Sequence, residues 1–87
     1  MTASYTINTS GDKYWTNESG LLHREDGPAV EYANGDKQWY LNGIRHREHA
    51  PAVEYISGAK RWYYQGIFID CENQEEFESL LKLKAFW

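Results

Sequence analysis

The feature that most constrains the fold of this 87-residue chain is an internal repeat. Residues 27–40 align with residues 50–63, and the matching proline, tyrosine, glycine and tryptophan positions are each 23 residues apart. The triplet His-Arg-Glu recurs at the same spacing, at 23–25 and 46–48. A degenerate earlier copy ends at Ser10–Trp15, with one extra residue before His23. Repeats of this length are single supersecondary units, which bury their apolar surface by stacking on one another.

Each copy has the pattern of a β-hairpin. The dipeptide Asn34-Gly35 is a strong signal for a two-residue turn, because a type I′ turn requires positive φ at both central residues. Ser57-Gly58 and Ser10-Gly11 are weaker versions of the same signal. Counting outward from Asn34-Gly35 predicts that Val30 faces Trp39 across the hairpin.

The second copy supports this register, because Val53 then falls opposite Trp62 and Glu54 falls opposite Arg61. Aliphatic–aromatic and opposite-charge cross-strand pairs each stabilise a sheet by about 0.2–1 kcal/mol. The face that carries the valines and tryptophans is therefore expected to be the core. The opposite face is expected to carry an exposed row of tyrosines interleaved with Glu31, Gln38, Glu54 and Arg61: Tyr14, Tyr40 and Tyr63.

The hydrophobic period changes after about residue 69. Asn73 is a good helix N-cap, and Glu76 three residues later completes the pattern of a capping box. An apolar stripe follows at helical spacing: Phe77, Leu80 and Leu81. The pattern predicts a helix over 72–84, and a helix of about twelve residues is marginal in isolation. It is therefore expected to dock on the valine–tryptophan face, with Phe86 and Trp87 covering its end.

These patterns predict one domain spanning residues 1–87, since a chain this short supports a single small core. The predicted fold class is mainly β with one C-terminal helix. Hairpin repeats over residues 3–69 would form an antiparallel meander of about six strands, and the helix at 72–84 would pack on the sheet.

The 23-residue period and the runs Asn34–Tyr40 and Asn42–His46 resemble the MORN repeat family. Residues 23–32 are similar to a MORN-like variant found in small proteins of tailed phages and bacteria. The resemblance covers about residues 12–69 and implies short hairpins stacked into an elongated single-layer sheet. Arg-Glu follows each histidine, at 24–25 and 47–48, where standard MORN repeats have glycines. The variant implies a small inhibitor or anti-defence protein acting on a host factor.

Composition and charge exclude several classes of function. The net charge of −4 argues against a nucleic-acid binder, whose affinity comes from clustered lysines and arginines. No segment approaches the roughly 20 apolar residues that cross a membrane. The first five residues lack the basic start and apolar run of a signal peptide. Cys71 is the single cysteine, so no internal disulfide can form and no compartment is implied by bridging. A cytoplasmic protein is the default expectation, in the host cytoplasm if it is encoded by a phage.

The histidine-containing segment 46–49 is a candidate metal site. His46 and His49 form a His-x-x-His pattern, and His23, Asp26 and Cys71 are further candidate ligands. A zinc site needs three or four ligands in a fixed geometry, and the first copy of the repeat lacks the second histidine. We therefore expect no metal and no other cofactor.

Catalysis is not expected either. Glu31 and Glu54 would project from an open sheet, where nothing raises a carboxyl pKa or excludes water. Cys71 lies beside Asp70 and Glu72 and lacks the positive surroundings that make a thiol reactive.

The remaining class is binding, and the aromatic content of 16% supports it because large aromatic rings recur at the centres of interfaces. The favoured interpretation is a non-enzymatic protein-binding module that uses the tyrosine face. In the His-Arg-Glu loops, the favoured interpretation is structural, with each histidine capping its loop and each arginine paired with the next glutamate. The alternative is that these arginines bind a partner. The candidate binding residues are Tyr14, Tyr40, Tyr63, Arg61, Glu54, Arg24 and Arg47.

Two other functions stay open at this point. One is a sponge for a small signalling nucleotide, with aromatic rings stacking on the base and arginine or histidine holding phosphates. The other is a structural protein that associates with itself through edge strands.

Overall fold

A computed structural model describes residues 4–83 of the chain. This part is mainly β, with one C-terminal helix, as the sequence predicts. Seven strands form an antiparallel sheet in the order β1-β2-β3-β4-β7-β8-β9, and β5 and β6 form a separate pair. The strands are β1 (Ser4–Ile7), β2 (Lys13–Thr16), β3 (Val30–Glu31), β4 (Lys37–Gln38), β5 (Tyr40–Leu41), β6 (Ile44–Arg45), β7 (Val53–Glu54), β8 (Lys60–Tyr64) and β9 (Ile67–Ile69), and the helix is α1 (Gln74–Leu83).

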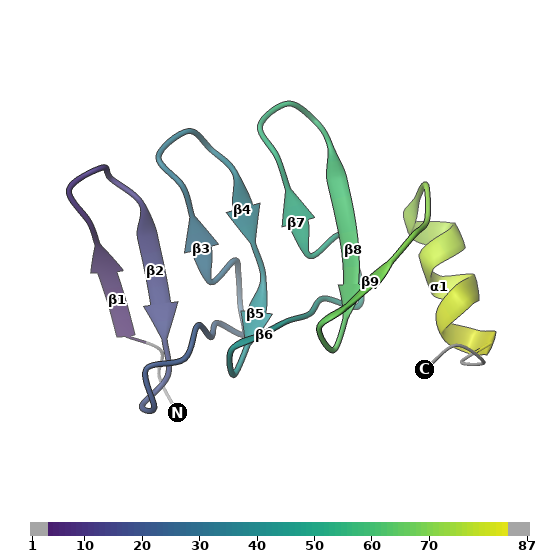
Figure 1. Cartoon of the computed structure of the whole chain (residues 1–87), viewed down its shortest axis with the longest axis horizontal. Coiled ribbons are helices and arrows are strands. Elements are labelled where there is room, and N and C mark those ends of the chain that lie inside the picture. Colours follow the sequence, from purple (N-terminus) through teal and green to yellow (C-terminus); the bar gives the residue numbers. More distant parts are fainter. Residues whose placement is uncertain (1–3, 84–87) are drawn as a thin grey trace.

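The three main hairpins, β1–β2, β3–β4 and β7–β8, stand side by side with their loops at the same edge (Figure 1). At the opposite edge the chain folds back three more times, at residues 17–21 and in β5–β6 and β8–β9. The described residues therefore contain more strands than the predicted six, because each of the later units carries a second, shorter turn.

The predicted register of the main hairpins is wrong by one residue. Val30 pairs with Gln38, not with Trp39, and Val53 pairs with Arg61, not with Trp62. The loop at 33–35 has three residues, since the amide of Tyr32 bonds the carbonyl of Asp36 and the amide of Gly35 bonds the carbonyl of Tyr32. A type I turn followed by a glycine at positive φ is the usual three-residue hairpin loop.

Two-residue turns do occur, but at the opposite edge of the sheet. Asn42 and Gly43 both have positive φ, at 52° and 83°, and they connect Leu41 to its partner Ile44. Residues 65–66 make the same turn between the last two strands. Asn-Gly is therefore compatible with both turn types, and the dipeptide alone does not fix the register.

The corrected register separates the aromatic residues into two faces. The tryptophan face carries Trp15, Trp39 and Trp62. Extending each ladder by one residue places the fully buried Ala29 and Ala52 between successive indoles. The amides of Trp15 and Trp39 bond the carbonyls of these alanines, both at 2.8 Å. A methyl side chain at each alanine leaves room for the two flanking rings.

The next row on the tryptophan face alternates in charge. Its members pair directly across the sheet, and they are Lys13, Glu31, Lys37, Glu54 and Lys60. Each glutamate thus lies between two lysines, which is the favourable arrangement for cross-strand pairs. Glu31 and Glu54 were predicted to lie among the tyrosines, and this prediction is wrong because the register differs by one residue.

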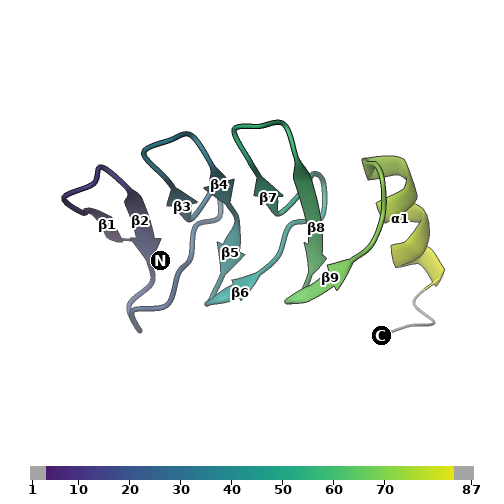
Figure 2. The same ribbon diagram turned by 45° about the horizontal axis from the view of Figure 1, so that its top comes forward.

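The tyrosine face carries Tyr14, Tyr40 and Tyr63 together with the valines. Val30 and Val53 are each only 2% exposed, although no helix lies over this face in the described part of the chain (Figure 2). Their cover comes from side chains of the same sheet, because Val30 pairs with Tyr14 and Gln38, and Val53 pairs with Gln38 and Arg61. The tyrosines are accordingly half-buried rather than fully exposed as predicted.

The helix begins as the sequence predicts. The Asn73 side chain accepts the amide of Glu76 at 2.8 Å, and the Glu76 carboxylate accepts the amide of Glu72 at 2.7 Å. The observed helix spans 74–83, against 72–84 predicted. Phe86 and Trp87, predicted to cover its end, lie outside the described residues.

The position of α1 differs from the prediction. The helix lies beside β9 at the C-terminal end of the row of hairpins, where it packs on the tryptophan face opposite the valines (Figure 1). Fully buried Phe77 packs with Trp62 and Ile69, and Gln74 accepts a hydrogen bond from the Trp62 indole at 2.8 Å. The helix therefore caps the last repeat, as terminal elements of repeat proteins do.

The three-residue loops make a prediction about glycine. Gly58 has φ +97° with open space around it, so Gly58→Ala should lower the free energy of unfolding by about 1–2 kcal/mol through backbone strain alone. Gly35→Ala should cost more, because a Cβ there would lie 2.7 Å from the Ile56 side chain, which must move. Chemical denaturation of both variants measures this, and a neutral Gly58→Ala would show that the loop has another conformation.

Candidate functional site

Each of the two His-Arg-Glu loops folds back over the indole of a tryptophan that precedes it in the sequence, Trp15 for residues 23–25 and Trp39 for residues 46–48. The guanidinium of Arg24 lies 4.0 Å from the ring centre of Trp15, and that of Arg47 lies 3.7 Å from the ring centre of Trp39. Such cation–π contacts contribute about 0.5–2 kcal/mol, depending on exposure.

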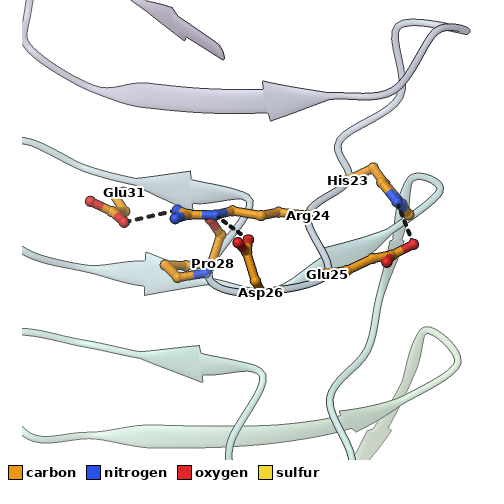
Figure 3. A network of polar contacts seen from close by, with 6 residues as sticks. All are labelled: His23, Arg24, Glu25, Asp26, Pro28 and Glu31. Atoms are coloured by element: carbon orange, nitrogen blue, oxygen red, sulfur yellow. Dashed lines mark hydrogen bonds and ion pairs between the residues drawn. The ribbon is translucent and has the colours of Figure 1, made fainter. Parts of the chain in front are cut away.

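Each arginine is also held by hydrogen bonds. Arg24 donates to Asp26, to the carbonyl of Pro28 and to Glu31, at 3.1–3.3 Å (Figure 3). Arg47 donates to the carbonyl of Pro51 at 3.0 Å and to Glu54 at 3.1 Å. The predicted pairing of each arginine with the next glutamate is therefore wrong, since the carboxylate partners are two or seven residues away.

The histidines have the structural role that the sequence favoured. His23 accepts the amide of Asn42 on Nδ1 at 2.9 Å, and His46 accepts the amide of Gln65 at 2.8 Å. Each histidine thereby links its loop to the two-residue turn of the next unit. It is the histidine, not the arginine, that lies beside the following glutamate, and Nε2 of His46 is 3.2 Å from Glu48.

An open groove of about 590 Å³ runs between the two loops on the tryptophan face. Residues 24–27 form one wall, residues 46–49 form the other, and Trp39 and Leu41 line it between them. Arg24 and Arg47 also line it, but the most exposed charged side chains on its rim are acidic, because Glu25, Asp26 and Glu48 are 78%, 88% and 52% exposed. Trp39 differs here from Trp62, because its indole N–H has no hydrogen-bond partner among residues 4–83.

An aliphatic row lies at the turn edge of the same face. Leu21, Ile44 and Ile67 are 46%, 49% and 45% exposed, and they recur at the 23-residue spacing of the repeat. Leu21 lies against Gly43 and Ile44 lies against Gly66, so the row continues from one unit to the next. The tryptophan face thus combines a groove, an acidic rim and exposed aliphatic side chains.

The tyrosine face is organised around Arg45, which the sequence analysis did not single out. Arg45 donates to the Tyr40 hydroxyl at 2.7 Å and to Gln38 at 3.0 Å, and its guanidinium lies 4.7 Å from the ring centre of Tyr63. Burial opposes the charge of Arg45, but the Tyr40 and Tyr63 hydroxyls more than offset this and raise its pKa. Tyr63 also packs against Phe68, with ring centres 5.5 Å apart.

The predicted binding residues consequently do not form one surface. Tyr14, Tyr40, Tyr63 and Arg61 lie on the tyrosine face, whereas Glu54, Arg24 and Arg47 lie on the tryptophan face. Sequence reasoning missed the groove and the aliphatic row. The recurrence of Leu21, Ile44 and Ile67 at the repeat spacing is a signal from which that row could have been found.

Within residues 4–83 no group of three or more histidine, cysteine, aspartate or glutamate side chains is placed to hold a metal ion. Cys71 is a free thiol packed against the cluster under α1. Burial, with added repulsion from Glu76 and Asp70, raises its pKa from an ordinary 9.0 to about 11. The folded protein therefore holds the thiol proton more tightly than the unfolded chain does.

This shift gives a prediction about reactivity and pH. At pH 8 the thiolate fraction should be lower by about 100-fold than in the denatured protein, so iodoacetamide should alkylate folded Cys71 correspondingly slowly. The raised pKa of Cys71 also adds to the free energy of unfolding. This contribution is present below about pH 9 and is lost as the pH rises towards 11. Equal alkylation rates in the folded and denatured protein would contradict the burial of this thiol.

No helix within residues 4–83 has the length and apolar content needed to cross a membrane. Compared with known proteins, the chain matches no family model, no curated protein and no solved structure.

Proposed function

We propose that the protein is a non-enzymatic protein-binding module that uses its tryptophan face. The observation that carries the proposal is the aliphatic row of Leu21, Ile44 and Ile67, which is joined to the groove between the His-Arg-Glu loops because Ile44 pairs with Leu41, a residue that lines the groove. A contiguous exposed apolar surface with a polar rim is typical of interaction sites. The acidic rim favours a partner with an apolar ridge flanked by lysines or arginines.

The partner proposed is a host protein, and the action proposed is inhibition in the host cytoplasm. This part of the proposal comes from the resemblance of the repeat to MORN-like proteins of phages, in which an inhibitor or anti-defence role is expected. The tyrosine face is a weaker candidate for the binding surface, because Tyr40 and Tyr63 are already engaged by Arg45.

A sponge for a small nucleotide is the second candidate function, and the contacts of the arginines count against it. Arg24 and Arg47 are each paired with a carboxylate and stacked on an indole. Three further carboxylates surround the groove, which would repel phosphate groups. A nucleotide would have to displace these ion pairs before the arginines could hold it.

The test compares two variants, Ile44→Glu and Phe68→Glu, whose original residues have the same exposed fraction. Ile44 on the tryptophan face and Phe68 on the tyrosine face are both 49% exposed. Affinity capture from host lysate with the wild-type protein, followed by mass spectrometry, identifies the partner. Ile44→Glu should then weaken binding of the purified partner by at least about fivefold, since a central interface residue contributes about 1 kcal/mol or more. Phe68→Glu should bind like the wild type.

Melting temperatures of both variants serve as the control for folding. Loss of binding in Phe68→Glu alone would move the site to the tyrosine face. Native mass spectrometry of the purified protein tests the nucleotide-sponge alternative. A nucleotide retained at one per chain, and released by Arg47→Ala, would replace the protein-binding proposal with the sponge.

A further inference from the structure

The N-terminal edge of the sheet is open in the described part of the chain. β1 pairs only with β2, and all four of its residues are exposed. The other end of the row is capped by α1, so the two ends differ. An uncapped edge strand presents unpaired amides and carbonyls to any second strand, and proteins normally protect such edges with charges, prolines or bulges. β1 reads Ser-Tyr-Thr-Ile and has none of these.

The backbone of β1 determines which residues are available to a second strand. The amide of Asn8 bonds the carbonyl of Asp12, and the ladder pairs Thr6 with Tyr14 and Ser4 with Thr16. Alternation along an antiparallel strand therefore directs the amides and carbonyls of Tyr5 and Ile7 outward. The side chains of these two residues lie on the tryptophan face and are 49% and 51% exposed.

These residues make the edge complementary to itself. If two β1 strands pair antiparallel about a two-fold axis through Thr6, Tyr5 of each copy lies opposite Ile7 of the other. Both pairs use the outward-directed backbone groups. The Thr6 side chains of the two copies lie opposite each other on the tyrosine face. Aromatic–β-branched and threonine–threonine pairs are among the favourable cross-strand pairs, and this register brings no like charges together.

We propose that the protein forms a two-fold dimer in which the β1 strands of two copies pair in this register and join the two sheets into one. The inference is independent of the proposed function, because the edge strand and the groove between the His-Arg-Glu loops are different surfaces. In such a dimer the tryptophan faces of both copies lie on the same side of the joined sheet, so the assembly would present two grooves to a partner.

The first test is cysteine cross-linking in the Cys71→Ser background. In the proposed register residue 6 meets its copy at a non-hydrogen-bonded position, where Cα atoms are about 4.5 Å apart and a disulfide can form. Thr6→Cys should therefore oxidise to a covalent dimer. Ser4→Cys is the matched control on the same strand and face, and its two copies would be about 13 Å apart. Equal cross-linking at both positions, or none at Thr6→Cys, would overturn the proposal.

The second test is the association of the untagged full-length chain by sedimentation equilibrium. The mass should rise from one chain to two with concentration. Ile7→Glu should abolish this rise without unfolding the protein, because Ile7 pairs with Lys13 and a glutamate there extends the alternating row of charges. Ile56→Glu makes the same charge change at an exposed loop residue and should still dimerise. A wild-type chain that stays monomeric, or an Ile7→Glu variant that still dimerises, would refute the β1 interface.

Discussion

Phe77→Ala is expected to lower the free energy of unfolding by about 3–5 kcal/mol, as truncation of a large buried aromatic side chain does. Phe77 is fully buried and packs with Trp62 and Ile69, and the partly buried Leu80 and Leu81 of the helix pack against this cluster. Because a domain of this size has only about 5–10 kcal/mol of stability, the variant should be close to unfolding at room temperature. Chemical denaturation followed by circular dichroism measures the loss.

Leu83→Ala is the control for this prediction. Leu83 lies on the same helix but is 69% exposed, so its truncation should change stability by less than about 0.5 kcal/mol. Similar losses in the two variants would mean that α1 does not pack through Phe77. A stable, soluble Phe77→Ala protein would contradict the role of the helix as the cap of the last repeat.

The second large effect is expected at Ala52, which lies between the indoles of Trp39 and Trp62 and is fully buried. Ala52→Ile should destabilise the protein by about 3 kcal/mol, because a larger side chain forces both rings out of place. The change also separates Trp39 from the guanidinium of Arg47, now 3.7 Å from its ring centre.

The repeat itself supplies the control. Ala33 occupies in one hairpin loop the position of Ile56 in the next, 23 residues later, and both are exposed. Ala33→Ile therefore introduces a side chain that the next hairpin already has at the equivalent position, and the free energy of unfolding should change little. If Ala52→Ile lowers the free energy of unfolding no more than Ala33→Ile does, tryptophan and alanine do not alternate across the sheet.

Much of the fold could be predicted because its signals are local and recur. The 23-residue spacing predicts stacked hairpins, and Asn73 and Glu76 predict the start of the helix. The register could not be predicted from Asn34-Gly35, because this dipeptide suits a two-residue turn and also the last two positions of a three-residue loop. That single-residue difference exchanged the faces of Val30 and Glu31 relative to the tryptophans.

The candidate site was predicted less well, for a related reason. With the valines assigned to the tryptophan face, the tyrosines were expected to be uncovered and the glutamates to lie among them. In the structure Arg45 binds Tyr40, while Glu31 and Glu54 bind Arg24 and Arg47 on the other side. Contacts between residues seven positions apart depend on how each loop folds back over its strand, which no local pattern in the sequence specifies.

The most direct test of the binding account is the indole N–H signal of Trp39 in a ¹⁵N-edited NMR spectrum, assigned with a Trp39→Phe variant. On titration with the captured partner, this signal should shift, because Trp39 lines the groove and its N–H has no partner among residues 4–83. The Trp62 signal should stay in place, since its indole N–H donates to Gln74 and the residue is only 6% exposed. A partner that binds without moving the Trp39 signal, while shifting the amides of Tyr63 and Phe68, would contradict the tryptophan-face site.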